Sequence, residues 1–319
     1  MPRPCAVESH VRGYKKHGDS KIRLIPNYNT PKCTRRPHPV FIQPYEPHEL
    51  NFAYCYRFYL RFRTHAYRPY AALATLSRRE LDALVRPNGV RVLQCATDST
   101  DVLAMLSLQP SETISAAADK VKGRVSKWLR EALALQAPTN LLSKGYFAST
   151  IGKSTQAAID KYLSEQGEHH GYAQRQLPPI FVDQYQLGEA DLARVSPKHA
   201  VVVSQFHFVL ATAGRRGIFG AQEGQAIAAE WQKIQQTTRT ALVKVSFVPD
   251  HVHIALRAHP AESPADIVAR LMNSAQEVVS GDLVRVGLEW LWQTSGYIGS
   301  YGNLATPQMR KYIEGWKRR

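Results

Sequence analysis

The stretch FHFVLAT at residues 206–212 is an apolar run that ends in the basic turn AGRRG. Such a run predicts a buried β-strand followed by a turn. A matching stretch, FYLRFRT at residues 58–64, is followed by HAYRP. A second pair of strands ends at Asp250 in VKVSFVPD and at Asp98 in VRVLQCATD, and an Asn-Gly turn precedes the latter. The chain therefore carries two copies of one structural plan.

Each copy continues in the same order. An apolar strand follows each Asp, then come a proline and a helix with an apolar period of three to four residues. Near the end of each copy, Tyr162 stands ten residues after Gly152, and Tyr312 stands ten residues after Gly302. The plan predicts an α+β fold of two ferredoxin-like domains, each an antiparallel sheet with helices, that form an internal pseudo-dimer.

The 319 residues divide into four predicted regions. Residues 1–48 are a basic, proline-containing arm without an apolar period, and the Cys and His spacings within it match no common zinc pattern. Residues 49–166 and 199–319 are the two domains. Residues 167–198 are predicted as the linker that lets the second copy fold back beside the first.

The charge balance indicates a polyanionic partner. The chain has 41 Lys and Arg against 26 Asp and Glu, a net charge of +15 and a pI near 9.7. A basic surface kept for solubility is the alternative. No apolar run of about 18 residues, apolar leader or C-x-x-C pair is present. We therefore expect a soluble cytoplasmic, nucleoid-associated protein with reduced thiols and no membrane span.

The sharpest local pattern is VPDHVHI at residues 248–254. Residues two apart on a strand share a face, so His251 and His253 present two neighbouring imidazoles that could bind a divalent metal. An exposed strand edge is the alternative, because one H-x-H is weak evidence. Tyr162 and Gln166, four residues apart, lie on one helix face and offer a nucleophile and an amide oxygen. Tyr312 lacks that partner, since Trp316 holds the equivalent place.

Basic and aromatic residues supply further candidates for nucleic-acid contact. Solvated helix faces are the alternative for the basic ones, and strand alternation places half of the aromatic ones in the core. His207, inside an apolar strand, is predicted to be a core histidine. The phosphate-binding candidates are Lys120, Lys122, Arg124, Lys127, Arg215 and Arg216, and the base-stacking candidates are Tyr54, Tyr56, Phe58 and Tyr59.

In combination these residues resemble a known family, the single-strand-specific tyrosine transposases of the HUH endonuclease superfamily, which include the insertion-sequence and REP-associated tyrosine transposases. The shared elements are the early strand with its Thr and basic turn, VPDHVHI, the Lys-Gly-Arg-x-Ser helix at residues 122–126, the Gly-Tyr segment and the final Lys-Tyr helix. The likeness covers about residues 51–166 and 199–317.

The resemblance implies a DNA endonuclease and strand transferase with HUH-type domains. Members cut single-stranded DNA beside hairpins, work as dimers and join the 5′ phosphate to a tyrosine. It implies that His251 and His253 bind Mg²⁺ or Mn²⁺ with Gln166 as third ligand, and that Tyr162 or Tyr312 is the nucleophile. Phenols are poor nucleophiles and good leaving groups, which suits a reversible ester on a metal-polarised phosphate.

The sequence departs from the family pattern in complementary ways. The first copy has residues 98–101, DSTD, where the second has residues 250–253, DHVH, while the second has lost the helix Gln. We therefore predict one composite site, in which Tyr162 and Gln166 of the first copy meet the imidazole pair of the second. Tyr312, facing Ser99 and Asp101, would then be silent and kept for DNA binding or symmetry. The competing arrangement places Tyr312 in cis with the imidazoles.

The predicted function is metal-dependent cleavage and rejoining of single-stranded DNA through a 5′-phosphotyrosine, as in transposition or recombination, by an internal pseudo-dimer that can act as one chain. The first alternative is a catalytically inactive or regulatory single-stranded DNA-binding protein derived from such a transposase. The second is a replication initiator or conjugative nickase of the same superfamily, which the order of histidines before tyrosine disfavours.

Overall fold

The computed structural model describes residues 45–136, 140–164, 181–285 and 287–316. These residues belong to one compact unit, Ile42–Arg319. Residues 1–44 of the predicted basic arm lie outside the described residues, and so does Gln166. Among the described residues, no helix is both long and apolar enough to cross a membrane.

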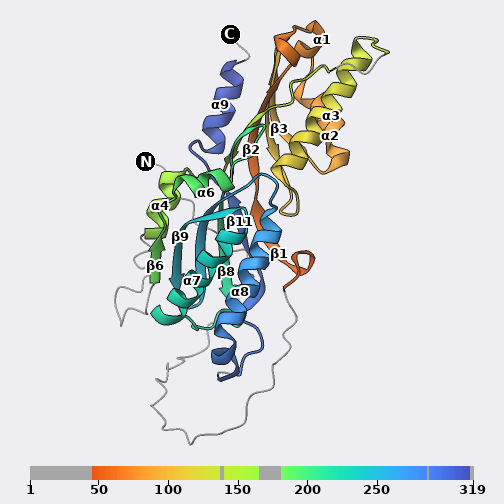
Figure 1. The fold of residues 1–319 in the computed structure, drawn as a ribbon. Coiled ribbons are helices and arrows are strands. Elements are labelled where there is room, and N and C mark those ends of the chain that lie inside the picture. Colours follow the sequence, from red (N-terminus) through yellow and green to blue (C-terminus); the bar gives the residue numbers. More distant parts are fainter. Residues whose placement is uncertain (1–44, 137–139, 165–180, 286, 317–319) are drawn as a thin grey trace, which may run out of the picture. The chain divides into compact units, whose positions relative to one another are not determined.

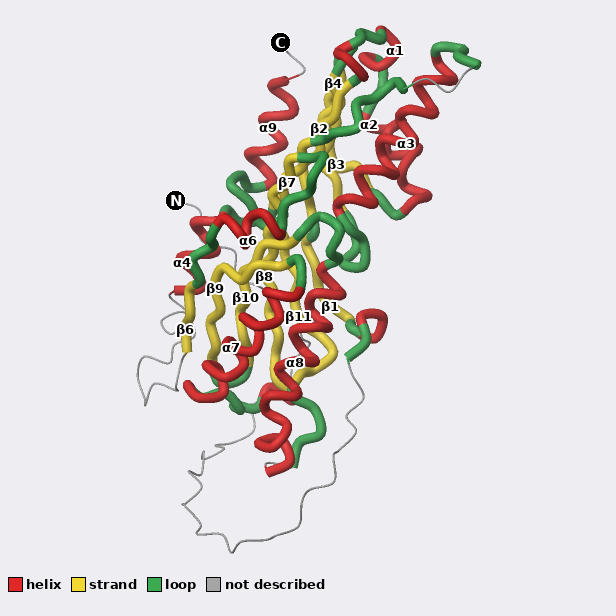
Figure 2. Tube along the Cα trace, in the orientation of Figure 1, coloured by secondary structure: helices red, strands yellow, loops and turns green. Residues whose placement is uncertain are grey.

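Two sheets form the framework, as Figures 1 and 2 show. Sheet A has the strand order β1-β11-β8-β10-β9-β6, and sheet B has the order β3-β4-β2-β5-β7. Sheet A consists of β1 (Asn51–Cys55), β11 (Trp292–Ser300), β8 (Gln205–Thr212), β10 (His251–Ala258), β9 (Thr240–Val248) and β6 (Phe181–Gln184). Sheet B consists of β3 (Arg91–Thr97), β4 (Asp101–Ser107), β2 (Arg57–Arg63), β5 (Phe147–Ile151) and β7 (Val201–Val203).

The two sheets repeat one register. The Thr64 backbone N–H donates to the Thr100 carbonyl at 2.8 Å, and the Thr212 N–H donates to the Asp250 carbonyl at 2.9 Å. In both sheets the long central strand pairs antiparallel with the strand after the Asp turn and with the strand before the tyrosine helix. The predicted α+β class, with two sheets that are mainly antiparallel, is confirmed.

The halves exchange their first strands. β1, from the first half of the chain, pairs parallel with β11 of the second half, and β7, which precedes β8, pairs parallel with β5 of the first half. Residues 181–198, predicted as linker, contain β6, which extends sheet A beside β9, and a short helix, α6 (Glu189–Arg194). Each sheet is therefore completed by strands that the sequence plan assigns elsewhere.

Helices cover both faces of each sheet. α7 and α8 pack on one face of sheet A, and α2 and α3 are the corresponding helices of the first half. The tyrosine helices are exchanged, because α4 contacts β9 of sheet A whereas α9 contacts β3 and β4 of sheet B. The helices are α1 (Ala71–Ala74), α2 (Arg78–Val85), α3 (Ile114–Ala132), α4 (Gln156–Ser164), α6 (Glu189–Arg194), α7 (Ala221–Thr237), α8 (Pro264–Arg285) and α9 (Thr306–Trp316), with short 3-10 turns at Pro47–Glu49, His65–Tyr67, Arg86–Asn88 and Ala213–Arg215.

Local sequence explains where the long helices begin. Thr113 precedes α3, and its hydroxyl accepts a hydrogen bond from the backbone N–H of Ala116 at 3.1 Å. Ser263 plays the same part for α8, accepting from the backbone N–H of Asp266 at 3.1 Å. These side-chain oxygens satisfy backbone donors that a helix start leaves without a partner. Ser263 stands directly ahead of Pro264 and Asp266, an arrangement typical of a helix start.

Reciprocal contacts join the halves where each chain crosses to the opposite sheet. The Thr306 N–H donates to the Gly152 carbonyl at 2.8 Å, and the Gln156 N–H donates to the Gly302 carbonyl at 2.9 Å. A Cβ on Gly152 would lie 1.9 Å from the Ser300 carbonyl oxygen. Only glycine fits at such a close approach of two backbones. The crossing sends each tyrosine helix onto the sheet of the other half.

Candidate active site

Imidazoles gather on one face of sheet A. In β10, Val252, Ile254 and Leu256 belong to the core beneath α7 and α8. Because side chains alternate along a strand, His251 and His253 point to the opposite face. Both rings are 3% exposed, and their centroids lie 5.0 Å apart. The predicted side-by-side placement of the pair is therefore present, on the face that α4 covers.

Asp250 orients the first imidazole. Its Oδ1 lies 2.6 Å from His251 Nδ1, and its Oδ2 accepts from Arg215 Nε at 3.0 Å. Burial lowers the pKa of His251, and the Asp250 carboxylate opposes that shift. A lowered pKa favours the neutral ring at neutral pH, and the neutral ring is the form that can bind a metal. The contact with Nδ1 leaves Nε2 as the nitrogen through which this ring would coordinate.

His207 orients the second imidazole. Its Nε2 lies 3.1 Å from His253 Nδ1, and the two rings stack with centroids 5.3 Å apart. Burial lowers the pKa of His207 to about 4, so this ring is neutral at pH 7. As with His251, an engaged Nδ1 means that His253 would coordinate through Nε2. The histidine predicted to belong to the core is buried, but its partner is the imidazole pair.

Helix α4 brings Tyr162 from the first half of the chain to these rings. The Tyr162 ring centroid lies 5.3 Å from that of His253, with the planes at 84°, and 6.3 Å from that of His207. The apolar side of α4 secures this placement, since Ile159 and Leu163 pack in one cluster with Ala255 of β10 and with Tyr301, which follows β11. The phenol and the imidazole pair thus come from different halves.

A lysine fastens the end of α4. Lys244 of β9 is 6% exposed, and its Nζ donates to Ser164 Oγ at 2.5 Å. The same Nζ lies 3.5 Å from the Asp160 carbonyl. A buried ammonium needs such oxygens because its desolvation is costly. The contacts hold the last turn of α4, which carries Tyr162, against sheet A.

Tyr312 lies on the other sheet. Its ring centroid is 6.1 Å from that of Tyr59 in β2, and α9 packs through Met309 and Ile313 on the face of sheet B that Leu103 shares. The structure therefore brings Tyr162, and not Tyr312, to the imidazoles. This placement is the one that the composite arrangement requires, while the identity of the nucleophile stays a prediction.

The register corrects how the sequence aligns the two turns. β10 pairs His251 with Ala211 and His253 with Val209, whereas β4 pairs Asp101 with Arg63 and Leu103 with Arg61. Because Thr64 and Thr212 are equivalent, Asp101 and Leu103 occupy the places of the two histidines. The predicted match of residues 98–101 with residues 250–253 is wrong by two positions.

Asp98 has a different part from Asp250. Its Oδ1 accepts from the backbone N–H of Thr100 at 2.6 Å and from that of Asp101 at 2.7 Å, which closes the turn between β3 and β4. Ser99, once expected to face Tyr312, lies in this turn, where its carbonyl accepts from the Tyr70 N–H at 2.8 Å. The turn between β3 and β4 is longer than the turn between β9 and β10, so the residues after it are shifted relative to those of the second half. An alignment of Asp98 with Asp250 therefore fails.

The imidazole pair fits a divalent cation in its donor chemistry. Two buried rings, each with a contact at Nδ1, match the usual environment of histidine ligands. Among the residues described, no group of three or more His, Cys, Asp and Glu side chains is placed to hold a metal ion. Gln166, the predicted third ligand, is an amide and lies outside those residues.

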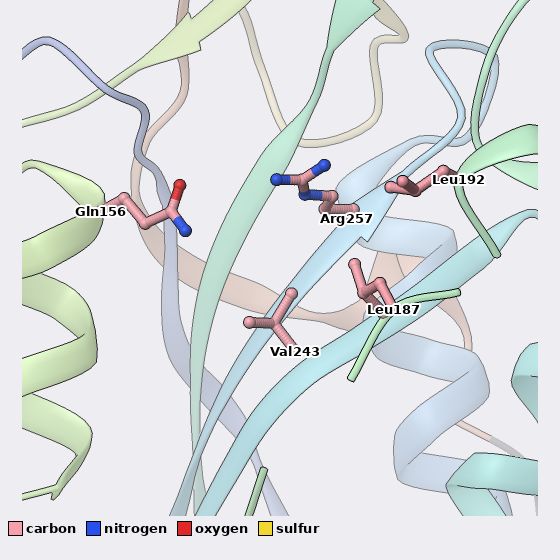
Figure 3. Close-up of a pocket in the computed structure, with 5 residues that line it drawn as sticks. All are labelled: Gln156, Leu187, Leu192, Val243 and Arg257. Atoms are coloured by element: carbon pink, nitrogen blue, oxygen red, sulfur yellow. The ribbon is translucent and has the colours of Figure 1, made fainter. Parts of the chain in front are cut away.

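A pocket of about 270 Å³ adjoins the start of α4. Figure 3 shows Val243 and Arg257, from adjacent strands, between Gln156 on one side and Leu187 and Leu192 on the other. The lining contains neither the imidazoles nor a tyrosine. The pocket is thus separate from the imidazole cluster, although both border α4.

Comparison with known sequences identifies the family. A family described as transposase, IS200-like, matches residues 74–166 and 200–315, once in each half and over more than half of the chain. The chain belongs to the IS200-like transposase family. Family membership makes it a transposase-type enzyme that processes DNA, arranged as two copies in tandem. No curated protein matches the chain.

Two solved structures show distant likenesses to this transposase. A protein from Deinococcus radiodurans R1, provisionally described as a transposase, is 22% identical over 38% of this chain and 95% of its own, with a TM-score of 0.31. The inactive domain of a peptidase M16 from Pseudomonas fluorescens is 12% identical over 77% of this chain and 80% of its own, with a TM-score of 0.15. At these scores neither structure adds to the account of the site.

Most of the predicted phosphate-binding residues of the transposase make hydrogen bonds or ion pairs with other residues of the chain. Lys120 lies 2.7 Å from Glu112, and Lys122 donates to the Lys144 carbonyl at 2.5 Å. The remaining contacts are Arg124 with Asn88 at 2.9 Å, Lys127 with Glu131 at 3.9 Å and Arg215 with Asp250 at 3.0 Å, while Arg216 is exposed. Nothing in these contacts tests DNA binding, which remains a prediction for all six.

Of the aromatic candidates in the transposase, Tyr56 and Phe58 are buried in the main core, and Tyr54 is 46% exposed. Tyr59 lies on the opposite face of β2 from Phe58, beside Tyr312. His207 is the site residue that sequence reasoning missed. Phe206, Phe208 and Leu210 alternate with it, so its position on the face opposite the core could have been read from the pattern.

Proposed function

We propose that this transposase cleaves and rejoins single-stranded DNA at one composite site, through a 5′-phosphotyrosine at Tyr162. The observation that carries the proposal is the 5.3 Å separation between the ring of Tyr162, from the first half, and the ring of His253, from the second. The phenol, the two imidazoles and their orienting groups meet only because α4 crosses to sheet A. Among the described residues, no histidine lines the groove that contains Tyr312.

Each residue has a defined part in the proposal. His251 and His253 would hold a Mg²⁺ or Mn²⁺ ion through Nε2, with Gln166 as a further ligand. When bound, such an ion would withdraw charge from a phosphate oxygen and make the phosphorus more susceptible to attack. Asp250 and His207 hold the rings in one orientation and one tautomer, as outer groups do for histidine ligands.

Tyr162 supplies the nucleophile. Its Oη would lose its proton and form a bond to phosphorus, while the bond to the 3′ oxygen breaks and that oxygen leaves as a hydroxyl after taking up a proton. One phosphate ester replaces another, so no external energy source is required. A phenol is a good leaving group, which allows a 3′ hydroxyl to reverse the step and rejoin the strand. Recognition of hairpins beside the cut is part of the same proposal.

The imidazole pair provides the test of the function. Purified His251→Ala/His253→Ala protein should lose scission of a labelled, hairpin-bearing single strand in Mn²⁺ by about 10³-fold or more. His65→Ala, which removes an exposed histidine outside the site, should cut as the unaltered chain does. Undiminished scission by the double variant contradicts the proposal. Binding without scission by the unaltered chain in Mg²⁺ and in Mn²⁺ supports the inactive or regulatory DNA-binding protein instead.

A further inference from the structure

The first half retains a hollow at the place that corresponds to the composite site. A groove of about 520 Å³ lies between β2, β5 and α9. Tyr59 and Tyr312 line it, and by the shared register they stand where His207 and Tyr162 stand in the composite site. Phe147, 38% exposed, forms another part of the wall. The two regions are equivalent in position but differ in their side chains.

Two arginines distinguish this groove. β4 pairs Leu103 with Arg61 and Asp101 with Arg63, whereas Val209 and Ala211 hold the arginine places in the second half. The histidine places are thus filled by Leu103 and by Asp101, which accepts from Arg61 Nε at 2.9 Å. A leucine and an ion-paired carboxylate do not supply the imidazoles that hold a cation in the other half. This groove therefore lacks the means to activate a phosphate for attack by Tyr312.

Positive charge nevertheless remains in the groove. Within the described part of the chain, the ion pairs of Arg61 and Arg63 are both with Asp101, at 2.9 and 3.8 Å, so one positive charge is left over there. The Arg61 and Arg63 side chains are 36% and 32% exposed. Lys122 adds a second cation beside the wall, 5.7 Å from the ring centroid of Tyr146. Guanidinium groups have several donors in a fixed plane, which suits phosphate oxygens.

Aromatic rings complete the character of a site for unpaired nucleotides. Tyr312 is 48% exposed and Phe147 38%, so both present ring surface to the groove and to solvent. Proteins bind single strands by stacking bases on such rings while cations follow the backbone. We propose that this groove binds an unpaired nucleotide of single-stranded DNA, with its phosphate at Arg61 and Arg63 and its base on Tyr312 or Phe147, and does not cleave it.

The groove then acts as a second binding site for the strand that the composite site cuts. This proposal rests on the proposed function only for the identity of the ligand, single-stranded DNA. The groove and the composite site share no residue. Loss of one stacked base should weaken binding by about tenfold. Loss of one arginine should also reduce the dependence of affinity on salt, by about 0.7 in the slope against log salt concentration.

Binding without metal gives the test. The full chain in EDTA is titrated into a fluorescein-labelled single strand of about 16 nucleotides, followed by anisotropy. Tyr312→Ala and Arg63→Gln should each raise the Kd about tenfold, and Arg63→Gln should lower the salt slope. Arg86→Gln removes an equally charged arginine, paired with Asp82 outside the groove, and serves as the control. Kd values for both groove variants within twofold of the control overturn the proposal.

Photocrosslinking of the unaltered chain tests the same claim without a substitution. A strand carrying 5-iododeoxyuridine should crosslink to peptides that contain Phe147 or Tyr312. Crosslinks confined to other peptides overturn the proposal, even if a variant fails to fold. Adduct formation in Mn²⁺ is measured separately on the unaltered chain. If no adduct forms but the groove variants bind DNA weakly, the proposed cleavage is wrong and the proposed nucleotide binding in the groove is supported. If an adduct forms and the groove variants bind DNA as the control does, the cleavage is supported and the nucleotide binding is wrong.

Discussion

The imidazole of His207 has an unusual position for a buried histidine, because its hydrogen-bond partner is another imidazole. A pKa lowered to about 4 by burial keeps the ring neutral, and its Nε2 meets His253 Nδ1 at 3.1 Å. Asp250 makes the corresponding contact with His251. The two candidate ligands are thus oriented by different chemical groups, one carboxylate and one neutral ring.

The contact between His207 and His253 makes a prediction for metal affinity. His207→Phe keeps a ring of similar size but removes Nε2, so His253 loses the group that fixes its tautomer. We expect Mn²⁺ binding, measured by isothermal titration calorimetry, to weaken by about 10–100-fold. His207→Gln places an amide near the same position and should recover part of the loss. Equal affinities in all three proteins would show that His207 has no part in positioning His253.

A second prediction concerns an ion pair next to the start of α8. Burial would raise the pKa of Glu262, but Arg270, whose Nη2 lies 2.6 Å from the carboxylate, and Arg239 outweigh it and lower the pKa below 4.5. The unfolded chain therefore binds more protons than the folded chain as pH falls through 4.5, and the stabilisation is lost in that window. Glu262→Gln should cost about 1 kcal/mol at pH 7, since both arginines are partly exposed.

The acid dependence checks this assignment. In urea titrations the difference between Glu262→Gln and the unaltered chain should shrink as the pH falls below 4.5. Glu230→Gln, which breaks an exposed pair with Lys233, should change the free energy of unfolding by less than about 0.5 kcal/mol at any pH. A difference for Glu262→Gln that stays constant to low pH would rule out the ion pair as its source.

At the scale of single elements, α4 decides what the site contains. It has few residues, and its hold on sheet A consists of a small apolar cluster and the Lys244 contacts. A short helix is marginal by itself, so packing must supply its stability. The position of Tyr162 over the imidazoles depends on this docking.

Lys244→Ala tests the docking of α4. The change removes a donor to Ser164 and leaves the last turn without its buried anchor. A hydrogen bond from a charged group contributes about 1.5–3 kcal/mol, so we expect covalent adduct to form at least about tenfold more slowly. The affinity for single-stranded DNA should change little, because Lys244 lies outside the groove that Arg61 and Arg63 line. Lys233→Ala, at an exposed position of α7, is the control, and an adduct rate equal to the control would contradict the role of Lys244.

The elements themselves were predictable where the apolar pattern is strong. The central strands, the H-x-H strand and the capped helix that begins at Pro264 follow from alternation, length and capping residues. The parallel strands β1 and β7 were not, because their partners lie in the other half and short strands carry little pattern. β6 was not predicted for the same reason, because it is a short strand in a segment whose sequence is typical of a linker.

At the scale of the whole molecule, the two halves are joined by a pair of crossings that require glycine. Gly152 and Gly302 each bring their backbone against that of the other half, and a Cβ would lie 1.9 and 2.0 Å from carbonyl oxygens of Ser300 and Thr150. The Thr150 hydroxyl donates to the Tyr301 carbonyl at 2.7 Å, and the Ser300 hydroxyl to the Ile151 carbonyl at 2.7 Å. The crossings fix which sheet each tyrosine helix reaches.

Substitution at the crossings should destabilise the whole chain. Gly152→Ala and Gly302→Ala force two backbones apart, and we expect each to lower the free energy of unfolding by about 3 kcal/mol and the Tm by roughly 6–12 °C. Gly123→Ala, in the middle of α3 with open space around the new methyl group, should instead be neutral or stabilise by up to about 1 kcal/mol. Differential scanning calorimetry compares the three, and equal Tm values would refute the tight crossing.

Duplication was readable from the sequence because spacing between motifs survives where the residues differ. The choice between composite and cis arrangements was not, since it depends on the direction of the chain after Gly152 and Gly302 and on long-range contacts. The sequence logic favoured the composite arrangement through the complementary loss of His and Gln. The geometry of α4 and α9 agrees with it, while the exact alignment of the two turns had to come from hydrogen-bond register.

The most direct measurement of the central claim locates the DNA on the protein. The chain is allowed to react with a short single strand in Mn²⁺, digested with trypsin and examined by mass spectrometry for a peptide that carries nucleotide. Trypsin cuts after Lys161 and after Lys311, so the two tyrosines fall in different peptides. The composite site predicts nucleotide on the peptide that begins at Tyr162. Nucleotide on the peptide that begins at Tyr312 would contradict it.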